Sequence, residues 1–199
     1  MKSNDNTVKE LPKVAVIRLS ALGDVVLCAS TVLHLAKSKK FKIYWITTSQ
    51  SRQLLGEIEG VEFIIVPKPK NLKCFIECRR ILSSYTFDYL LLAQASFSAH
   101  FVSMYVKAKR RIGFDQSRSK DFHGFFINER IEQREEHFVD AYYSFASMLG
   151  LQKPAAINWN GLFQSDRNHE LWNFEFPSTD RTMAINPSAS KTERNWEIN

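Results

Sequence analysis

The chain has 199 residues, of which 44% are hydrophobic and 24% are charged. This balance excludes a disordered or fibrous protein, and the length fits one domain, or one domain with a fragment of a second. The formal net charge of +6 favours anionic partners such as nucleic acid, phosphorylated substrates or an acidic membrane face, without choosing among them.

Residues 1–12 form a polar lead, and no apolar run approaches the ~18 residues that a bilayer span requires. The sequence therefore predicts neither a signal peptide nor a transmembrane helix. Three cysteines (Cys28, Cys74 and Cys78) cannot all pair with one another, and they lack the second pair that a zinc site needs. We expect a cytoplasmic protein without a bound metal, whose membrane contact, if any, is peripheral.

After the polar lead, short apolar runs alternate with segments of helical spacing. The run Val14–Ile17 is rich in β-branched residues, which is typical of a strand buried on both faces of a parallel sheet. Strands are expected at Val14–Ile17, Ile43–Thr47, Phe63–Val66, Tyr89–Ala93 and Arg111–Phe114. Helices are expected at Val25–Lys37, Ser49–Ile58, Leu72–Leu82, Ala99–Val106 and Glu135–Leu149, the last ending at Gly150. This alternation predicts an α/β fold with a parallel, right-handed sheet.

The periodicity weakens between Ser117 and Arg134, where three phenylalanines stand among charged residues. We expect this segment to be a long excursion that docks Phe122, Phe125 and Phe126 on the body of the domain.

The end of the chain has a different pattern, because Met183–Ile185 has the character of a new buried strand. We therefore expect residues 13–176 to form the α/β domain. Residues 177–199 are expected to be a linker and the first strand of a second, truncated domain.

The loop after the first strand concentrates polar chemistry, with Arg18, Ser20, Gly23 and Asp24 close together. In open α/β sheets, ligands bind beyond the carboxyl ends of the strands, so this loop is a candidate binding site. The residues alone leave a second interpretation open, in which Asp24 caps the next helix and Gly23 makes the turn. The 7 glycines of the chain form neither a dinucleotide-binding fingerprint nor a Walker A loop.

Five segments, in this order, resemble glycosyltransferase family 9, the ADP-heptose:lipopolysaccharide heptosyltransferases. They are Arg18–Leu27, Phe87–Gln94, Arg110–Asp115, Glu136–Asp140, and Ile185–Ser190 with Arg194–Trp196. The resemblance implies the N-terminal half of a GT-B fold, in which two Rossmann-like domains face a cleft. The N-terminal domain receives the acceptor, and the C-terminal domain holds the sugar nucleotide.

The resemblance implies that Asp24 is the general base, which takes the proton of the acceptor hydroxyl in an inverting, metal-independent transfer. Arg18 is a candidate for the cation that helps to keep this carboxylate ionised. The residues expected to bind the acceptor are Arg18, Ser20, Gly23, Gln94, Lys107 and Lys109. Lys107 and Lys109 belong to a basic cluster with Arg110 and Arg111, for which a solvated helix end is an equal alternative.

On the donor side, the resemblance implies that Ser188, Ser190 and Arg194 bind the sugar nucleotide. Ser188 stands where the family usually has glycine, whereas Arg194 keeps the positive charge that a diphosphate requires. The implied donor is ADP-heptose, which is a substrate, so no cofactor is expected. The implied acceptor is a lipid A-linked core oligosaccharide at the anionic cytoplasmic face of the inner membrane.

The sequence therefore predicts a family 9 heptosyltransferase of the lipopolysaccharide inner core, as an incomplete chain that is inactive alone. One alternative is a non-catalytic, truncated acceptor-binding module of the same family. Binding to nucleic acid is not expected, because the basic residues form no recognition motif and are not interleaved with aromatic residues.

Overall fold

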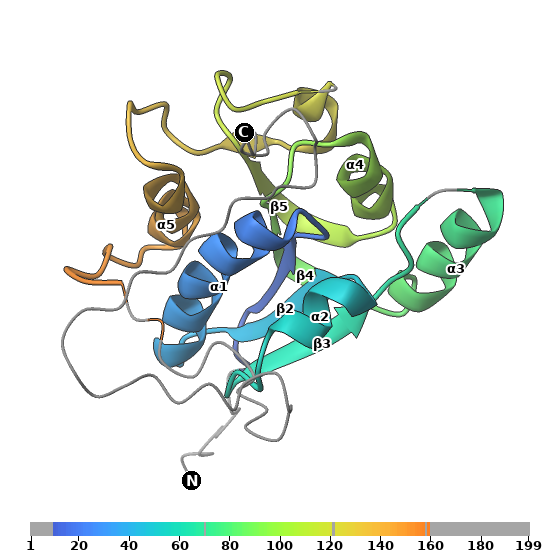
Figure 1. Cartoon of the computed structure of the whole chain (residues 1–199), viewed down its shortest axis with the longest axis horizontal. Coiled ribbons are helices and arrows are strands. Elements are labelled where there is room, and N and C mark those ends of the chain that lie inside the picture. The colour runs from blue at the N-terminus through green and yellow to red at the C-terminus, as the bar shows by residue number, and fades with distance from the viewer. Residues whose placement is uncertain (1–9, 70, 121, 158, 160–199) are drawn as a thin grey trace, which may run out of the picture. The chain divides into compact units, whose positions relative to one another are not determined.

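The computed structural model describes residues 10–69, 71–120, 122–157 and 159. Within these residues, six strands form one sheet in the order β3-β2-β1-β4-β5-β6, and every neighbouring pair is parallel (Figure 1). The strands are β1 (Lys13–Ile17), β2 (Lys42–Thr47), β3 (Val61–Ile65), β4 (Thr86–Leu92), β5 (Lys107–Gly113) and β6 (Glu129–Arg130). The helices are α1 (Leu22–Lys37), α2 (Ser49–Leu54), α3 (Leu72–Leu82), α4 (Phe97–Met104) and α5 (Phe138–Met148), with a 3-10 helix, η1 (His123–Phe126). This strand order is that of a Rossmann sheet, which confirms the predicted fold class.

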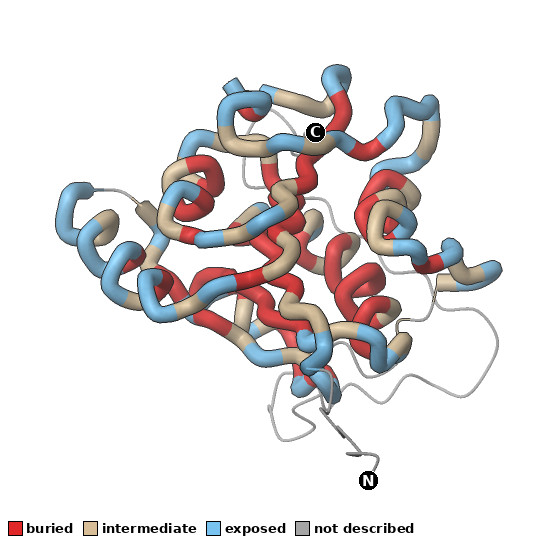
Figure 2. Tube along the Cα trace, turned by 180° about the vertical axis from the view of Figure 1, so that it is seen from behind, coloured by how far each residue is buried: buried red, intermediate tan, exposed pale blue. Residues whose placement is uncertain are grey.

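The central strands are covered on both faces, which explains their nearly continuous apolar sequences. Val14 and Val16 of β1 belong to the core shared with α1 and α5. Ala15 and Ile17 point the other way, into the core shared with α3 and α4. The buried residues accordingly follow the central strands and the inner sides of the helices in Figure 2.

Several predicted helix boundaries were wrong. α4 spans Phe97–Met104 and not Ala99–Val106, and α5 begins at Phe138 and not at Glu135. α1 begins at Leu22 with Ala21 as its N-cap, so Gly23 and Asp24 lie in the first helical turn and do not form a preceding turn. α2 ends at Leu54, because the buried residue Leu55 is already extended, with φ −90° and ψ 136°. The predicted end of α5 is confirmed, since Gly150 adopts φ +79° and donates its N–H to the Ser147 carbonyl.

The excursion after β5 is confirmed, but only one of its three phenylalanines docks. Phe126 stacks on His100 with ring centroids 4.6 Å apart. Phe122 and Phe125, in contrast, are 79% and 85% exposed, so their predicted docking was wrong. The segment is held instead by His123, whose Nε2 accepts a hydrogen bond from the Phe114 backbone N–H at 3.1 Å. The side chain of His123 fits there because residue 113 is glycine: a Cβ at Gly113 would lie 2.4 Å from His123 Nε2.

No helix in the described part of the chain has the length and apolar character needed to cross a bilayer. The predicted strand Met183–Ile185 and the predicted boundary after residue 176 lie outside the described residues.

Candidate active site

The central feature of the candidate site is an ion pair between Arg18, directly after β1, and Asp24, in the first turn of α1. Arg18 Nη2 meets Asp24 Oδ2, and Arg18 Nη1 donates to the Ala93 carbonyl at 2.8 Å. The side chain of Arg18 is 7% exposed, whereas that of Asp24 is 40% exposed. The buried guanidinium of Arg18 therefore holds one side of the Asp24 carboxylate, and the other side faces solvent.

The ion pair lies at the topological switch point of the sheet, where the order of the strands changes direction. β1 and β4 are neighbours, with Ile17 opposite Leu92 at their carboxyl ends, although β2 and β3 lie between them in sequence. At such a switch point the loops on the two sides diverge and leave a crevice in which ligands bind. The fold thus places Asp24 where an α/β protein holds its ligand.

Gln94 connects the loops that follow β1 and β4. Its Oε1 accepts hydrogen bonds from the backbone N–H groups of Leu19 and Ser20, at 2.7 and 3.2 Å. Its Nε2 donates to Ser96 Oγ at 2.8 Å and, more weakly, to Ser20 Oγ at 3.5 Å. Both ends of this buried amide are therefore engaged within the protein, and the geometry supports a role in holding the loop.

The end of β2 and the start of α2 support the same segment through side chains that sequence analysis missed. Thr47 Oγ1 donates to the Arg18 carbonyl at 2.8 Å, and Ser51 Oγ donates to the Leu19 carbonyl at 2.8 Å. Thr48 Oγ1 also contacts the Leu19 carbonyl, at 3.1 Å. Their signal in the sequence was the polar stretch directly after a predicted strand.

Tyr142 of α5 closes the buried side of the ion pair. Its ring centroid lies 5.8 Å from the guanidinium carbon of Arg18, and its side chain is fully buried. Burial raises the pKa of Tyr142 above its usual range, so the phenol remains neutral. Within the described residues, neither its hydroxyl nor Arg18 Nε has a hydrogen-bond partner.

Gly23 and the N-terminus of α1 leave open space beside Asp24. Apart from the adjacent residues and the backbone of α1 itself, no atom of the described residues lies within 4 Å of the position where a Cβ of Gly23 would be, and the N-cap residue makes no side-chain hydrogen bond to this helix. A carboxylate in the first turn is stabilised by the helix dipole, and the absence of a side chain at Gly23 lets a ligand approach the backbone.

The structure does not bring Lys107 and Lys109 to this site. They lie at the amino end of β5, whereas the site lies at the carboxyl end of the same sheet, level with Gly113. At ~3.3 Å per residue, Lys107 lies roughly 20 Å along the strand from Gly113. Lys109 also forms an ion pair with Asp88 at 2.9 Å. The alternative of a solvated helix end was wrong as well, because these residues form a strand.

The two arginines of the same cluster have structural partners. Arg110 forms a bidentate ion pair with Glu129 of β6, with contacts of 2.6 and 2.5 Å. Arg111 donates to the carbonyls of Ser103, Val106 and Phe126, each at 2.8 Å.

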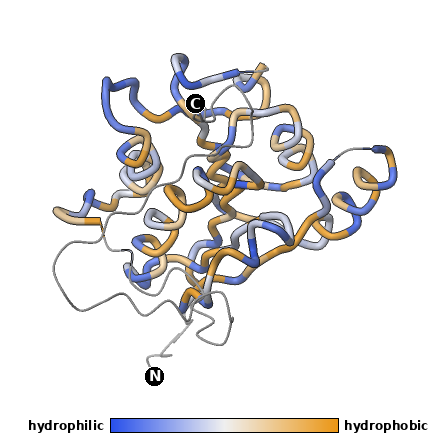
Figure 3. The backbone as a smooth tube through the Cα atoms, in the orientation of Figure 1, coloured by the Kyte–Doolittle hydropathy of each residue, from blue (hydrophilic) through white to orange (hydrophobic). Residues whose placement is uncertain are grey.

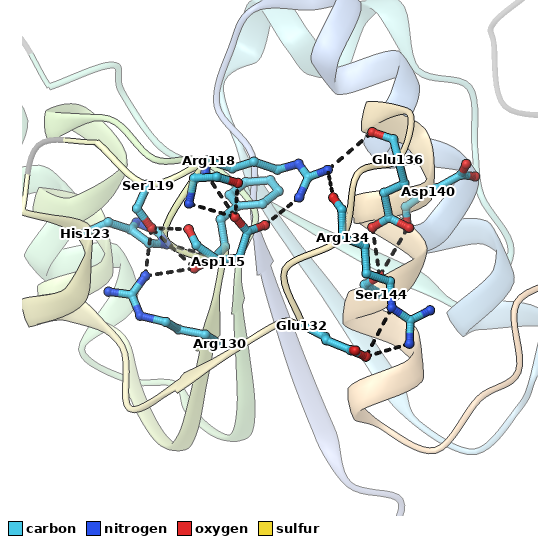
Figure 4. A network of polar contacts seen from close by, with 12 residues as sticks. Asp115, Arg118, Ser119, His123, Arg130, Glu132, Arg134, Glu136, Asp140 and Ser144 are labelled. Atoms are coloured by element: carbon cyan, nitrogen blue, oxygen red, sulfur yellow. Dashed lines mark hydrogen bonds and ion pairs between the residues drawn. The ribbon is translucent and has the colours of Figure 1, made fainter.

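A polar network organises the segment between β5 and α5 (Figure 4). Arg118 contacts Asp115 Oδ2 at 2.6 Å and also donates to the carbonyls of Arg134 and Glu136. Burial opposes ionisation of Asp115, but hydrogen bonds from Ser117 and Arg118 outweigh it and lower the pKa of Asp115. Arg118 thereby joins two segments that the sequence resemblance treats separately.

Beside this network, a hollow of about 440 Å³ opens next to η1. Its lining includes Lys120 and Arg130 together with the exposed rings of Phe122 and Phe125. The hollow therefore offers positive charge and aromatic surface beyond the carboxyl end of β5.

Among the described residues, no three His, Cys, Asp or Glu side chains are grouped as ligands for a metal ion. The predicted donor-binding residues Ser188, Ser190 and Arg194 lie outside the described residues.

Comparison with known proteins places this geometry in a family. Residues 76–199 match the family model described as glycosyltransferase family 9 (heptosyltransferase). The chain belongs to this family. It is 30% identical over 192 residues to the lipopolysaccharide core heptosyltransferase OpsX of Haemophilus influenzae, a match that covers 95% of this chain and 55% of OpsX. The family that the sequence motifs resembled is thereby confirmed.

Solved structures show the same fold. The chain is similar to the E. coli heptosyltransferase WaaC with ADP-2-deoxy-2-fluoro heptose, with a TM-score of 0.62 and 19% identity over 74% of this chain and 52% of WaaC. A family 9 glycosyl transferase from Veillonella parvula gives a TM-score of 0.58 and 18% identity over 71% of this chain and 42% of that structure. The chain thus spans about half the length of the relatives that it matches.

Proposed function

We propose that the chain is the acceptor-side half of an inverting heptosyltransferase, which transfers heptose from ADP-heptose to a lipid A-linked core oligosaccharide in the cytoplasm. The observation that carries this proposal is the half-exposed carboxylate of Asp24, held by buried Arg18 at the switch point of the sheet. Family membership supports it, because OpsX is a lipopolysaccharide core heptosyltransferase.

In the proposed step, the acceptor oxygen forms a bond to the anomeric carbon of heptose on the face opposite ADP. The bond between that carbon and the phosphate oxygen breaks, and ADP leaves with the electron pair. The acceptor proton passes to Asp24, whose carboxylate is free to receive it on its solvent side. Arg18 fixes the orientation of the carboxylate through a two-pronged contact with Asp24 and the Ala93 carbonyl.

The neighbouring residues have distinct roles in this proposal. Ser20 and Gly23 border the space in which the acceptor binds, and Gln94 keeps their loop in place. Lys120 and Arg130 offer positive charge to the acceptor at the same edge of the sheet, in place of Lys107 and Lys109. Donor binding is assigned to Ser188, Ser190 and Arg194, and the proposed step uses no metal and no cofactor.

The test is heptose transfer to lipid A-linked core by the complete natural polypeptide, with Asp24→Asn compared with the parent. The amide keeps an oxygen for Arg18 but cannot accept the proton, so we expect a loss of roughly 100-fold to 10,000-fold. The matched control is Asp140→Asn, which removes another carboxylate from a first helical turn, one paired with Lys153 at 2.7 Å.

The control variant is expected to stay within a few-fold of the parent, since Asp140 lies on α5 and not at the candidate site. An Asp24→Asn variant as active as Asp140→Asn would contradict the assignment of the base. We also expect the 199-residue chain alone to release no ADP from ADP-heptose, because it spans only 55% of OpsX and the proposal assigns most donor contacts to the remaining part.

A further inference from the structure

Helices α3 and α4 leave an apolar surface uncovered by the described residues. Its most exposed members are Leu72 (72%) and Ile76 (62%) on α3, and Phe97 (64%) and Met104 (59%) on α4. Isolated exposed apolar side chains are common, but a continuous patch on a soluble domain marks an interaction site. We call these four residues, with the half-buried rings of Phe75 and Phe101, the α3–α4 surface.

The surface is continuous because aromatic rings bridge the two helices. The ring centroids of Phe75 and Phe101 lie 4.1 Å apart, and those of Phe97 and Phe101 lie 5.2 Å apart. On α4, Phe97 and Met104 flank Phe101 at helical spacing, and on α3 Leu72 and Ile76 are one turn apart. Six side chains from two helices thus form one apolar stripe.

Positive charge accompanies this stripe on the α3 side. Lys68, Lys73, Arg79 and Arg80 are exposed on or beside α3, against one carboxylate, that of Glu77. None of the four basic side chains forms an ion pair with a described residue, whereas Lys109 and Arg110 on β5 are both paired. Polar and apolar segments alternate along α3 in Figure 3, and most of the helix is exposed in Figure 2.

This combination identifies the occupant. A protein partner of ordinary composition would satisfy the apolar residues, but unpaired lysines and arginines around a Leu, Ile and Phe stripe match the interface of an anionic bilayer. There, apolar side chains enter the boundary between headgroups and acyl chains, and basic side chains contact lipid phosphates.

We propose that the α3–α4 surface binds the protein to anionic phospholipid, with Leu72, Ile76 and Phe97 inserted at headgroup depth. Phe97 begins α4, next to Ser96, which accepts a hydrogen bond from Gln94 of the candidate site. The surface therefore starts at the sheet edge that carries Asp24, and docking brings this edge to the membrane. Its use in presenting a lipid-linked acceptor rests on the proposed function, whereas lipid binding itself does not.

The test is flotation of the full chain with vesicles of phosphatidylglycerol and phosphatidylethanolamine, which contain no acceptor, and with vesicles of phosphatidylcholine alone. We expect binding to the anionic vesicles only, weakening with salt because screening shortens to about 3 Å at 1 M ionic strength. Ile76→Ser with Phe97→Ser, and separately Lys73→Gln with Arg80→Gln, are each expected to weaken binding at least ten-fold.

Two matched controls separate position from composition. Leu11→Ser removes an exposed apolar side chain just before β1, and Lys107→Gln with Lys109→Gln removes two charges at the same amino edge of the sheet. Both control variants are expected to bind like the parent, with circular dichroism confirming equal folding. A tryptophan at position 72 (Leu72→Trp) is expected to show a blue-shifted emission with anionic vesicles, and one at position 11 (Leu11→Trp) is not.

The proposal is overturned if the parent does not bind anionic vesicles at low salt, or if a control variant loses as much binding as the α3–α4 variants. It is also overturned if the α3–α4 variants abolish self-association of the chain while lipid binding persists, since the occupant would then be a second copy. None of these outcomes bears on Asp24, because the vesicles contain neither donor nor acceptor.

Discussion

Replacing Gln94 by leucine tests whether this residue holds the loop of the candidate site or contacts the acceptor. The leucine fills a similar volume but removes the oxygen that accepts from the N–H groups of Leu19 and Ser20. Leu19 is 1% exposed, so its N–H is left buried without a partner, at a cost of about 1–3 kcal/mol. Ser20 is half-buried and water satisfies its N–H more easily, adding about 0.5–1 kcal/mol.

We therefore expect Gln94→Leu to lower the free energy of unfolding by about 1.5–4 kcal/mol, measured by urea unfolding at pH 7. At roughly 2–4 °C per kcal/mol for a chain of this size, the melting temperature falls by about 3–16 °C. The control is Gln53→Leu, the same change at an exposed position on α2, which is expected to stay within about 0.5 kcal/mol of the parent.

A Gln94→Leu variant as stable as Gln53→Leu would refute the loop-holding role. Gln94 would then return to the acceptor contact predicted from sequence, and the substitution would raise KM for the acceptor while leaving stability unchanged.

Two further predictions concern buried groups. Burial, together with His100 and Arg130, lowers the pKa of His123 to about 4, so the unfolded chain binds more protons than the folded one between about pH 4 and 6.5. The contribution of His123 to the free energy of unfolding is therefore complete above about pH 6.5 and falls by about 3 kcal/mol as the pH drops to 4, measured by urea unfolding, and His123→Gln flattens this dependence. Tyr142→Phe removes a buried hydroxyl that has no partner among the described residues, so we expect unchanged stability or a gain of up to about 1 kcal/mol. A loss above that amount in the same assay would show that the hydroxyl is hydrogen-bonded.

The order of strands and helices was predictable because a sheet buried on both faces demands nearly continuous apolar runs. Val14–Ile17 is such a run, because its alternate residues are buried in the two cores on opposite faces of the sheet. β5 was recognised only from Arg111 onwards, because its first residues are lysines and arginines with few apolar neighbours. Pairing with β4 makes Lys107–Arg110 a strand, and tertiary pairing of this kind is not encoded in local composition.

The candidate site was predictable where its residues are close in sequence. Arg18 and Asp24 are separated by one short loop, and their ion pair follows from that proximity. The contact of Gln94 with the same loop depends on β1 lying beside β4, which is a property of strand order. Lys107 was misplaced because residues 107–110 were not recognised as the first part of β5, whose amino end lies at the edge of the sheet opposite the candidate site.

The kind of partner that the charged residues attract depends more on where these residues lie than on the net charge of the chain. Lys109, Arg110 and Arg118 each have a carboxylate partner, so they contribute little field beyond their own ion pairs. The unpaired cations of α3 lie instead next to the apolar side chains of the α3–α4 surface. Helix α4, which carries part of this surface, begins directly after the loop of Gln94. A bilayer attracted to α3 therefore meets the edge of the sheet that carries Asp24, whereas one attracted to Lys107 would meet the opposite edge and leave the carboxylate facing away. Only the first arrangement lets a lipid-linked acceptor hydroxyl reach Asp24 while its lipid remains in the membrane.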